Sequence, residues 1–430
     1  MHLALRSSPL AALLAAVATA QQAPSAKEVD QAVGAFFAAD DKTEAGHTAR
    51  LAILARLAAL PALDGKQQKA WQQKIGKLWA KGRTLTKSGD NWFWPAEGKG
   101  GEKRGRYLVG GETKKPKGLV IAMHGGGVGF GDPVGLAGSY GPALQQLGYL
   151  MIAPGVLAQT ECGWTDSGTE EFVIDLVDAA LRTWQIDPDH VYLAGFSMGG
   201  HGAWVLGAHH ADRTAALAAS SGAPTPIRNA PGGPIVDLQD GVVPSLRNVF
   251  AAIYQGGADP QVTPDGNRFA VQRLAEAAQK WGGYTHDYWE VAGKGHDDPP
   301  GGPIALLRRI AGKARSVIPE RIVWQPALPW KRQFAWLYWD KPVLGALVVA
   351  DLDRKANTIT VTCDKPANGL QVLLDGRVLD LGREVTVTVN GATVFRGTPT
   401  ADLGTLLLTS DHPDPGLQFA VRVPATSGGN

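Results

Sequence analysis

Cysteine is scarce in this sequence: only Cys162 and Cys363 occur among 430 residues. They lie about 200 residues apart, in segments that we assign to different domains. Neither has further cysteine or histidine residues at the spacing of a zinc site. We therefore predict two unpaired, partly buried thiols, although an oxidising compartment would permit a disulfide.

The sequence also has almost no net charge, because its 42 Lys and Arg residues nearly balance its 40 Asp and Glu residues and leave a formal charge of +2. A protein that neutralises many phosphates needs a basic patch. The densest basic stretches, residues 99–106 and 114–117, are diluted with Gly, Glu and Pro, and we expect solvated loops there. The charge balance gives no support for nucleic acid or an anionic membrane surface as a partner.

Long apolar runs are absent as well, since no stretch reaches the ~20 residues that a membrane-spanning helix needs. The N-terminus has Arg6, an apolar stretch over residues 10–18 and the small-residue pattern Ala18-Thr19-Ala20. These features predict a secretory signal peptide cleaved after Ala20, with an ordinary alanine-rich helix as the alternative. We expect a secreted or periplasmic protein without a membrane span.

The overall composition, 44% hydrophobic and 19% charged, is that of a folded chain, and its length favours two or three domains. Apolar residues recur at helical spacing in residues 49–60 and 67–80. This helical part shows no evident chemistry. The predicted divisions are a signal peptide (1–20), a helical pre-domain (21–90), an α/β domain (91–318), a Trp-rich connector (319–343) and a β-sandwich-like domain (344–430).

Strands and helices alternate between residues 91 and 318. Residues 119–123 form a continuous apolar run, typical of a strand buried on both faces. Such alternation predicts a mostly parallel sheet with helices on both faces. The expected strands are 92–94, 106–109, 118–123, 149–153, 190–194, 217–220, 249–255 and 286–291, and the expected helices are 141–147, 170–184, a helix after Ser197, 269–281 and 303–316.

The C-terminal part is rich in β-branched residues. Asp375-Gly376 and Asn390-Gly391 separate such runs and predict two tight hairpins. Residues 402–409 are the one candidate helix. We expect a small antiparallel β-sandwich without a cluster of catalytic residue types. The tryptophans of the connector are expected to pack this domain against the α/β domain, with carbohydrate stacking as the alternative: Trp324, Trp330, Trp336 and Trp339.

Ser197 is the central candidate for chemistry. It lies in Gly195-Phe196-Ser197-Met198-Gly199-Gly200, between an apolar strand and a helix. A serine on so sharp a turn is exposed and strained, and it needs small neighbours because a Cβ there would meet backbone. Its oxygen also lies near the positive end of the following helix. The placement makes Ser197 a candidate nucleophile.

A glycine run supports this assignment. His124-Gly125-Gly126-Gly127 follows the strand at 118–123, where an oxyanion hole takes one of its backbone N–H groups. We expect Gly125 or Gly126 to supply it, and Met198, the residue after the nucleophile, to supply the other.

The acid and the base of a triad also have candidates. Asp259 follows the strand at 249–255, and Asp265 is the second choice because it lies farther from that strand. His296 lies in the Gly-rich loop 293–297, after the strand at 286–291. The order Ser197, Asp259, His296 is that of α/β-hydrolases.

Residues 91–316 resemble α/β-hydrolase esterases of the polyhydroxybutyrate depolymerase, feruloyl esterase and acetylxylan esterase group, and are similar to catalytic domains of the prolyl oligopeptidase family. The resemblance covers a little over half of the chain. The missing β-propeller distinguishes the chain from the peptidases of that family. The matching stretches are AMHGGG (122–127), IDPDHVYLAGFSMGGHGAW (186–204), GGADPQV (256–262) and GKGHD (293–297).

We therefore expect an exported serine esterase without a cofactor or metal, acting on small-molecule or polymeric esters, with plant-polysaccharide esters or polyesters as candidate substrates. Residues 222–248 carry five prolines and little helical pattern, which favours an open site without a helical cap. His209-His210 could suggest a metal site, but adjacent helical residues diverge, so we do not predict one. The alternatives are a serine peptidase and a non-catalytic binding protein whose β domain is the working part.

Overall fold

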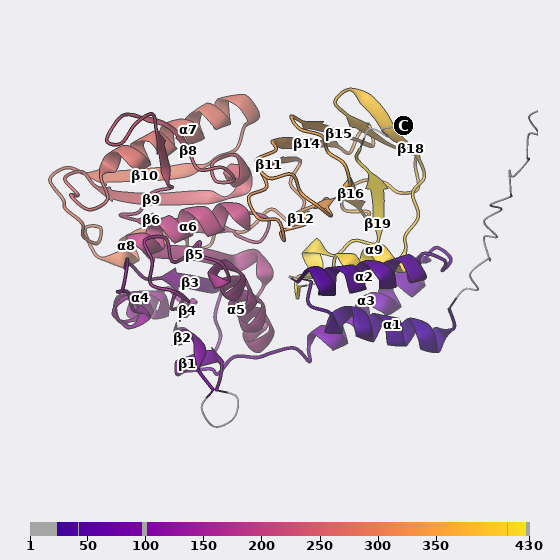
Figure 1. Cartoon of the computed structure of the whole chain (residues 1–430), viewed down its shortest axis with the longest axis horizontal. Coiled ribbons are helices and arrows are strands. Elements are labelled where there is room, and N and C mark those ends of the chain that lie inside the picture. Colours follow the sequence, from indigo (N-terminus) through magenta and orange to yellow (C-terminus); the bar gives the residue numbers. More distant parts are fainter. Residues whose placement is uncertain (1–23, 42, 97–100, 411, 427–430) are drawn as a thin grey trace, which may run out of the picture. The chain divides into compact units, whose positions relative to one another are not determined.

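The computed structural model describes residues 24–41, 43–96, 101–410 and 412–426 (Figure 1). The chain divides into two compact units, Met1–Pro61 and Ala62–Asn430. The predicted signal peptide, residues 1–20 with its cleavage site, lies outside the described residues. Within the described ranges, no helix combines the length and apolar character needed to cross a membrane.

The first unit contains two helices, α1 (Ala26–Ala38) and α2 (Glu44–Leu57). Ser25 and Glu28 form a reciprocal capping box that starts α1. Arg56 of α2 lies 2.9 Å from Glu28, and the Arg50 guanidinium lies 4.7 Å from the centre of the buried Phe36 ring. The helical character predicted for this segment is confirmed.

Helix α3 (Gly65–Trp79) belongs to the second unit. Its Trp79 Nε1 donates to the Ser410 carbonyl oxygen at 2.6 Å. Arg182 Nε donates to the Trp79 carbonyl oxygen at 2.7 Å, with its guanidinium over the Trp79 ring. The predicted pre-domain, residues 21–90, is therefore divided in the structure, because Trp79 ties α3 to residues much later in the chain.

An eight-stranded sheet organises the second unit, in the order β1-β2-β4-β3-β5-β6-β9-β10. Strand β2 runs antiparallel to both its neighbours, and all other neighbouring pairs are parallel. The predicted mostly parallel sheet is confirmed. The strands are β1 (Gly89–Trp94), β2 (Arg104–Gly111), β3 (Leu119–Met123), β4 (Leu150–Pro154), β5 (Val191–Phe196), β6 (Ala216–Ser220), β9 (Phe250–Gly256) and β10 (His286–Val291).

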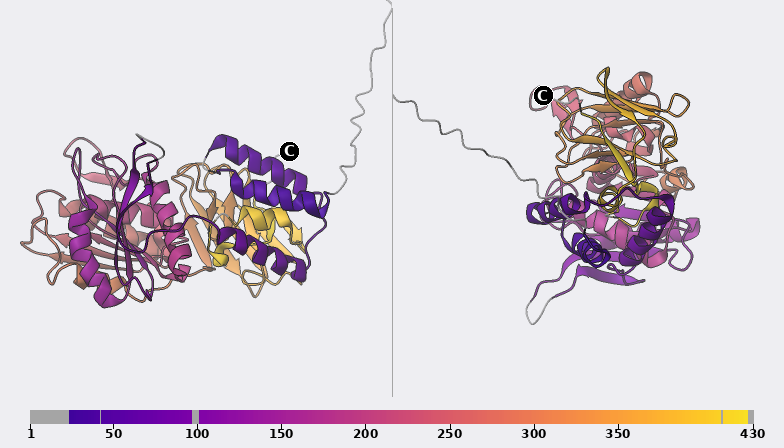
Figure 2. Two further views of the ribbon diagram at one scale, coloured as in Figure 1. Left: turned by 90° about the horizontal axis from the view of Figure 1, so that it is seen from below. Right: turned by 90° about the vertical axis from the view of Figure 1, so that its right-hand side faces the viewer.

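Helices cover both faces of this sheet, as Figures 1 and 2 show. Leu119 and Ile121 of β3 join the core under α5 (Thr169–Trp184), α6 (Met198–His209) and α7 (Pro264–Trp281). Val120 and Ala122 face α4 (Pro133–Leu147) and α8 (Pro303–Ile310) instead. Successive strand residues point to opposite faces, so the continuous apolar run of β3 fills both layers.

Three helix boundaries differ from the sequence prediction by five residues or more, one of them the start of α7 at Pro264 in place of 269. Helix α4 begins at Pro133, eight residues before the predicted 141, because Asp132 accepts from the Val134 N–H and Pro133 occupies the first helical position. Helix α8 ends at Ile310, and Gly312, with φ of 75°, follows it. Only glycine adopts that conformation readily.

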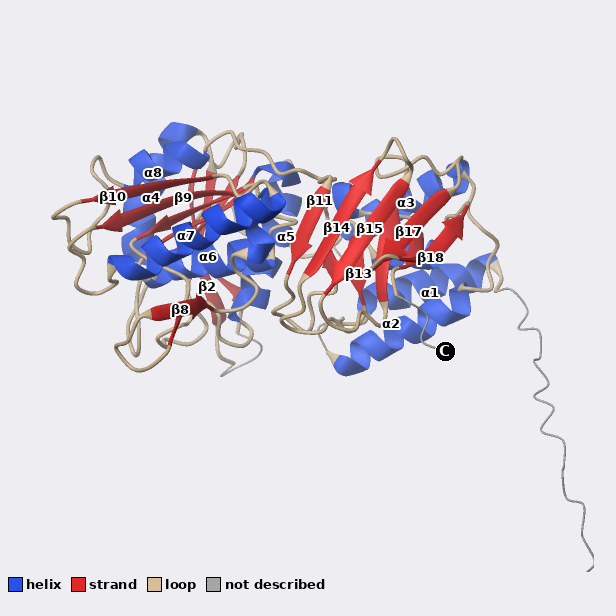
Figure 3. Ribbon diagram, turned by 90° about the horizontal axis from the view of Figure 1, so that it is seen from above, coloured by secondary structure: helices blue, strands red, loops and turns tan. Residues whose placement is uncertain are grey.

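The C-terminal residues form two further sheets, the larger of which is visible in Figure 3. The predicted two-sheet β domain and the helix near 402–409 are confirmed. The five-stranded sheet contains β11 (Arg321–Trp324), β14 (Val348–Asp353), β15 (Thr358–Cys363), β17 (Val385–Val389) and β18 (Ala392–Gly397); the four-stranded sheet contains β12 (Gln333–Phe334), β13 (Leu337–Trp339), β16 (Leu370–Leu374) and β19 (Val421–Pro424); and α9 spans Leu403–Leu408.

The segment predicted as a connector, residues 319–343, is instead part of these sheets, since it supplies β11 to one and β12 and β13 to the other. Its aromatic rings account for this. Trp324, Trp336 and Trp339 are at most 2% exposed, and the Trp324 ring stacks on Phe334 at 5.4 Å. These three rings are core residues and offer no exposed face to a sugar. The predicted packing against the α/β part is seen at Trp330, whose ring lies 5.7 Å from that of His210.

One of the two predicted hairpins is present. Asn390 and Gly391, both with positive φ, join β17 to β18 in a two-residue turn. Asp375-Gly376 does not form a hairpin, because the chain passes from β16 in one sheet to β17 in the other. The Asp375 side chain accepts from the Arg377 N–H, and the turn then buries Val378. The larger sheet is also not purely antiparallel, since β15 and β17 are parallel.

Residues 222–248 form a short hairpin, β7 (Pro226–Arg228) with β8 (Ile235–Leu238), followed by a 3₁₀ turn at Pro244–Asn248. No α-helix occurs in this segment, every residue of which is described, so the expected absence of a helical cap here holds. Cys162 is exposed and Cys363 is buried, and both are free thiols.

Candidate active site

Ser197 lies between β5 and α6 in a conformation that few residues adopt, with φ of 58° and ψ of −122°. Two glycines make the turn possible. A Cβ at Gly195 would lie 2.2 Å from the Gly199 oxygen, and one at Gly199 would lie 1.8 Å from the Met123 oxygen. The turn therefore excludes side chains at both positions and holds Ser197 at the N-terminus of α6.

His296 and Asp259 complete a continuous hydrogen-bonded set with this serine. His296 Nε2 lies 2.9 Å from Ser197 Oγ, and His296 Nδ1 lies 2.7 Å from Asp259 Oδ2. With the carboxylate as acceptor, Nδ1 carries the proton and Nε2 accepts from the serine hydroxyl. The structure thus brings together the three residues that the sequence analysis proposed as a triad.

The carboxylate of Asp259 is held from several sides. Its side chain is fully buried, and its Oδ1 accepts from the backbone N–H groups of Gln261 and Val262, each at 2.9 Å. Gln255 Nε2 lies 3.4 Å from Oδ2. These donors leave Oδ2 directed at His296 and fix the orientation of the imidazole.

Gln255 and Asn267 were not identified from the sequence. Both are fully buried. Asn267 Nδ2 donates to Gln255 Oε1 at 2.8 Å and to the Gly222 oxygen at 3.1 Å, and Trp204 Nε1 donates to Asn267 Oδ1 at 3.2 Å. A glutamine closing the apolar strand 249–255 was the available signal, since a buried amide needs partners.

The predicted oxyanion residues lie next to the serine. A Cβ at Gly125 would lie 3.1 Å from Ser197 Cβ. Met198 is the first residue of α6, so its N–H has no partner within the helix. A Cβ at Gly126 would lie 3.3 Å from Met198 Cε. Gly125 and Met198 therefore border Ser197 directly, and Gly126 lies next to the Met198 side chain.

His124 braces the start of this glycine run. Its Nδ1 donates to the Gly125 oxygen at 2.8 Å, and its Nε2 accepts from the Val156 N–H at 3.3 Å. Trp164 Nε1 donates to the His124 carbonyl oxygen at 3.0 Å. Burial lowers the pKa of His124, with partial opposition from its bond to Gly125. A neutral imidazole therefore fixes the loop and takes no part in the hydrogen-bonded set of Ser197.

Two other candidate residues are placed elsewhere. Asp265, the second choice for the triad acid, pairs with Arg228 at 2.6 Å. His209 Nδ1 and His210 Nε2 both lie within 3.0 Å of Glu170 Oε1. The two imidazoles converge because His210 leaves the helical conformation, with φ of −115° and ψ of 35°. In the part of the chain that is described, no group of three or more His, Cys, Asp or Glu side chains is suited to a metal ion.

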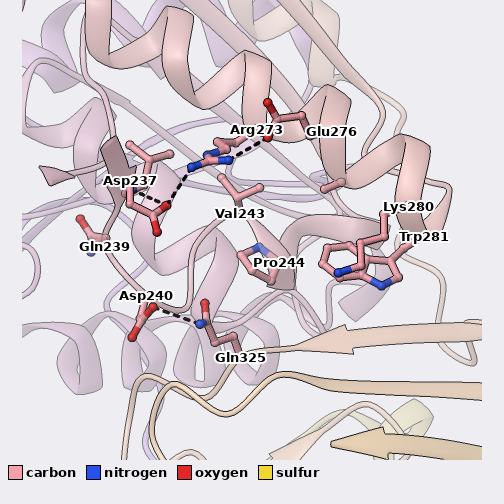
Figure 4. Close-up of a pocket in the computed structure, with 12 residues that line it drawn as sticks. Asp237, Gln239, Asp240, Val243, Pro244, Arg273, Glu276, Lys280, Trp281 and Gln325 are labelled. Atoms are coloured by element: carbon pink, nitrogen blue, oxygen red, sulfur yellow. Dashed lines mark hydrogen bonds and ion pairs between the residues drawn. The ribbon is translucent and has the colours of Figure 1, made fainter. Parts of the chain in front are cut away.

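A pocket of about 340 Å³ lies between α7 and the segment that follows β8 (Figure 4). Several of its polar groups contact one another: Arg273 pairs with Glu276 and lies 3.6 Å from Asp237, and Gln325 donates to Asp240. Lys280 lies over the Trp281 ring. Ser197, Asp259 and His296 are not among its lining residues. It offers no nucleophile beside a base, so the chemistry is assigned to Ser197.

An eight-stranded sheet whose second strand alone is reversed, with the serine after β5, the aspartate after β9 and the histidine after β10, is the arrangement of the α/β-hydrolase fold. The protein has this fold, as the sequence predicted. No protein-family model matches the chain, and no curated protein matches it in sequence.

Several esterases are among the solved structures that are similar to the chain. A thermostable esterase shares 18% identity over 53% of this chain and 63% of its own, with a TM-score of 0.38. A CE1 ferulic acid esterase from Anaeromyces mucronatus shares 18% identity over 52% of this chain and 88% of its own, with a TM-score of 0.36. A phospholipase/carboxylesterase from Dyadobacter fermentans shares 17% identity over 47% of this chain and 95% of its own, with a TM-score of 0.35. The chain thus spans less than two thirds of the first of these.

Proposed function

We propose that the protein is a serine hydrolase that cleaves carboxylic esters through an acyl-enzyme on Ser197. The observation that carries the proposal is the unbroken set of hydrogen bonds from Ser197 through His296 to Asp259, with the serine half-buried on a strained turn. The N–H groups of Met198 and Gly125 or Gly126 beside it suit a developing oxyanion.

In the first half of the proposed reaction, His296 Nε2 takes the proton of Ser197 as Oγ attacks the ester carbonyl carbon. The tetrahedral oxyanion accepts hydrogen bonds from the backbone N–H groups, each of which is typically worth ~3–4 kcal/mol in the transition state. Asp259 stabilises the imidazolium and holds its tautomer. The imidazolium then gives its proton to the departing alcohol, and the acyl group remains on Ser197.

In the second half, water replaces the alcohol. His296 takes a proton from the water as its oxygen attacks the acyl-enzyme, and it returns that proton to Ser197 Oγ when the acid leaves. The same donors stabilise the second oxyanion. All the groups required belong to the chain itself.

The proposed substrates are small or polymeric esters, with esters of plant polysaccharides and polyesters as candidates. The short β7–β8 hairpin in place of a helical cap supports access for bulky esters. Export is part of the proposal and rests on residues 1–20. N-terminal sequencing of protein secreted by a host that processes signal peptides should begin at Gln21, and a start at Met1 would contradict it.

A fluorophosphonate probe tests the nucleophile. We expect one covalent adduct, located on Ser197 by peptide mass spectrometry, and turnover of p-nitrophenyl acetate. Cleavage of peptide but not of simple esters would favour a peptidase on the same residues. Absence of both the adduct and turnover would favour a non-catalytic binding protein.

A further inference from the structure

Two apolar side chains stand exposed on the loop that follows β3. Val128 is 65% exposed and Phe130 is 63% exposed, the highest values for large apolar side chains among the described residues, and the next is Val134 at 49%. Their loop also carries Gly125, which borders Ser197. Exposed apolar side chains on a loop that borders a reactive residue are typical of a ligand-binding surface.

The loop is fixed at several points. Gly127 and Phe130 exchange two backbone hydrogen bonds, at 3.1 and 3.3 Å. Gln159 holds the loop from outside, since its carbonyl oxygen accepts from the Gly129 N–H at 3.0 Å and its Nε2 donates to the Gly131 oxygen at 2.8 Å. The Phe130 ring folds back over Gly127, where a Cβ would lie 2.9 Å from it. The Phe130 ring and the backbone on either side of Val128 are therefore held in place before any ligand binds, which lowers the entropy cost of binding.

The topology assigns the loop to one side of the ester. Strand β3 lies on one side of β5, and β6, β9 and β10 lie on the other. His296, after β10, must reach the alcohol oxygen to protonate it, so the alcohol leaves toward that side. The oxyanion accepts from the N–H groups of Met198 and Gly125, so the acyl group takes the one remaining direction at the tetrahedral carbon. Val128 and Phe130 are the exposed apolar side chains on the loop that carries Gly125.

We infer that Phe130 and Val128 form an acyl-binding platform, and that the preferred substrates carry a large apolar acyl group in place of acetyl. This inference rests on the proposed ester hydrolysis at Ser197. A longer acyl chain covers more of the Phe130 ring, and the water released from both surfaces favours binding.

The test compares kcat/KM for p-nitrophenyl hexanoate and p-nitrophenyl acetate, with active sites counted by fluorophosphonate titration. We expect Phe130→Ser to lower the hexanoate-to-acetate ratio about tenfold, within the usual range for lost apolar contacts in a substrate pocket. Val128→Ser should lower it less, and Phe130→Leu should keep most of it. Leu344→Ser removes another exposed apolar side chain, 47% exposed and in the C-terminal part, and should leave the ratio unchanged.

A second series varies the alcohol, with ethyl acetate and hexyl acetate as substrates. The inference is overturned if the hexanoate-to-acetate ratio of both serine variants equals that of the parent, or if their losses appear in the alcohol series instead. In either case the parent protein still labels at Ser197 and hydrolyses acetate, so the proposed function stands. A parent that neither labels nor turns over any ester overturns both.

Discussion

The two ends of helix α6 carry the same pair of chemical groups in different settings. At its N-terminus, His296 lies between Ser197 Oγ and Asp259. At its C-terminus, His209 and His210 share the carboxylate of Glu170. Histidine and carboxylate meet at 2.7 Å in the first and at 2.9 and 3.0 Å in the second, so distance does not distinguish them.

Their surroundings do. The Glu170 side chain is 4% exposed, and the His210 ring lies 5.7 Å from Trp330. The Glu170 carboxylate is hydrogen-bonded to the two imidazoles and, among the described residues, to no hydroxyl group. Burial alone would raise the pKa of Glu170, but His209 and His210 outweigh it and bring the pKa to about 2. A histidine–carboxylate pair closed in this way stabilises the fold. It becomes a candidate for catalysis where a strained serine and unpartnered backbone N–H groups lie beside it.

The largest expected effect comes from Ser197→Ala. Removing the nucleophile should lower kcat for p-nitrophenyl acetate by ~10⁴-fold or more, while the melting temperature stays within a few degrees of the parent. Steady-state kinetics and thermal unfolding measure the two quantities. Turnover close to that of the parent would refute the assignment of the nucleophile.

The opposite result is expected at the other end of α6. Glu170→Ala leaves His209 Nδ1 and His210 Nε2 without their buried acceptor, which should lower the free energy of unfolding by about 3 kcal/mol. The kcat per labelled Ser197 should not change. Denaturant unfolding and active-site titration check this. A large loss of kcat at unchanged stability would show that Glu170 serves catalysis and not the fold.

Acid should destabilise the fold through two buried histidines. Burial lowers the pKa of His210 to about 4, against partial opposition from Glu170, and burial with Arg213 lowers the pKa of His412 to about 3. Both pKa values lie below the unfolded value of ~6.5, so the unfolded chain binds more protons than the folded chain. The free energy of unfolding is therefore highest above pH 6.5, and it decreases as the pH falls toward 4.

Each histidine should lower the free energy of unfolding by about 2 kcal/mol when the pH falls from 7 to 5. His412→Phe should therefore remove about half of the loss attributable to the pair. Melting temperatures measured across this pH range provide the check, and a variant as acid-sensitive as the parent would exclude His412 as a source.

The smallest expected effect concerns the support of Asp259. Gln255→Met removes a donor from the carboxylate and should lower kcat about tenfold with KM unchanged, because the imidazole is less firmly oriented in the transition state. Asn267 loses a partner as well, so unfolding is measured alongside. An unchanged kcat would show that the two backbone N–H groups of Gln261 and Val262 suffice.

Sequence reasoning succeeded where a local rule determines the structure. The elbow at Ser197 follows from glycines that admit no Cβ, and β3 follows from a continuous apolar run. It failed where contacts between residues far apart in the chain determine the structure. Residues 319–343 became strands because Trp324 and Phe334 stack in a core to which far-removed strands contribute, and Asp375-Gly376 passes between sheets because Val378 is buried. Phe130 gave no signal, since exposure depends on what the fold leaves uncovered.

The side chain of Arg315 has a practical consequence for protein engineering. It is 1% exposed, it donates to the Asp212 carbonyl oxygen, and it pairs with Asp414 at 2.6 Å. Lys331 pairs with the carboxylate of the same Asp212 at 2.8 Å. A truncation after residue 318 would remove Asp414 and Lys331, so Arg315 would keep only its pair with Asp189 and the Asp212 carboxylate would lose its ion-pair partner. It would also uncover the apolar core shared with Trp324. The α/β part of this chain is therefore not a transferable module, and a minimal folded variant has to retain the C-terminal sheets.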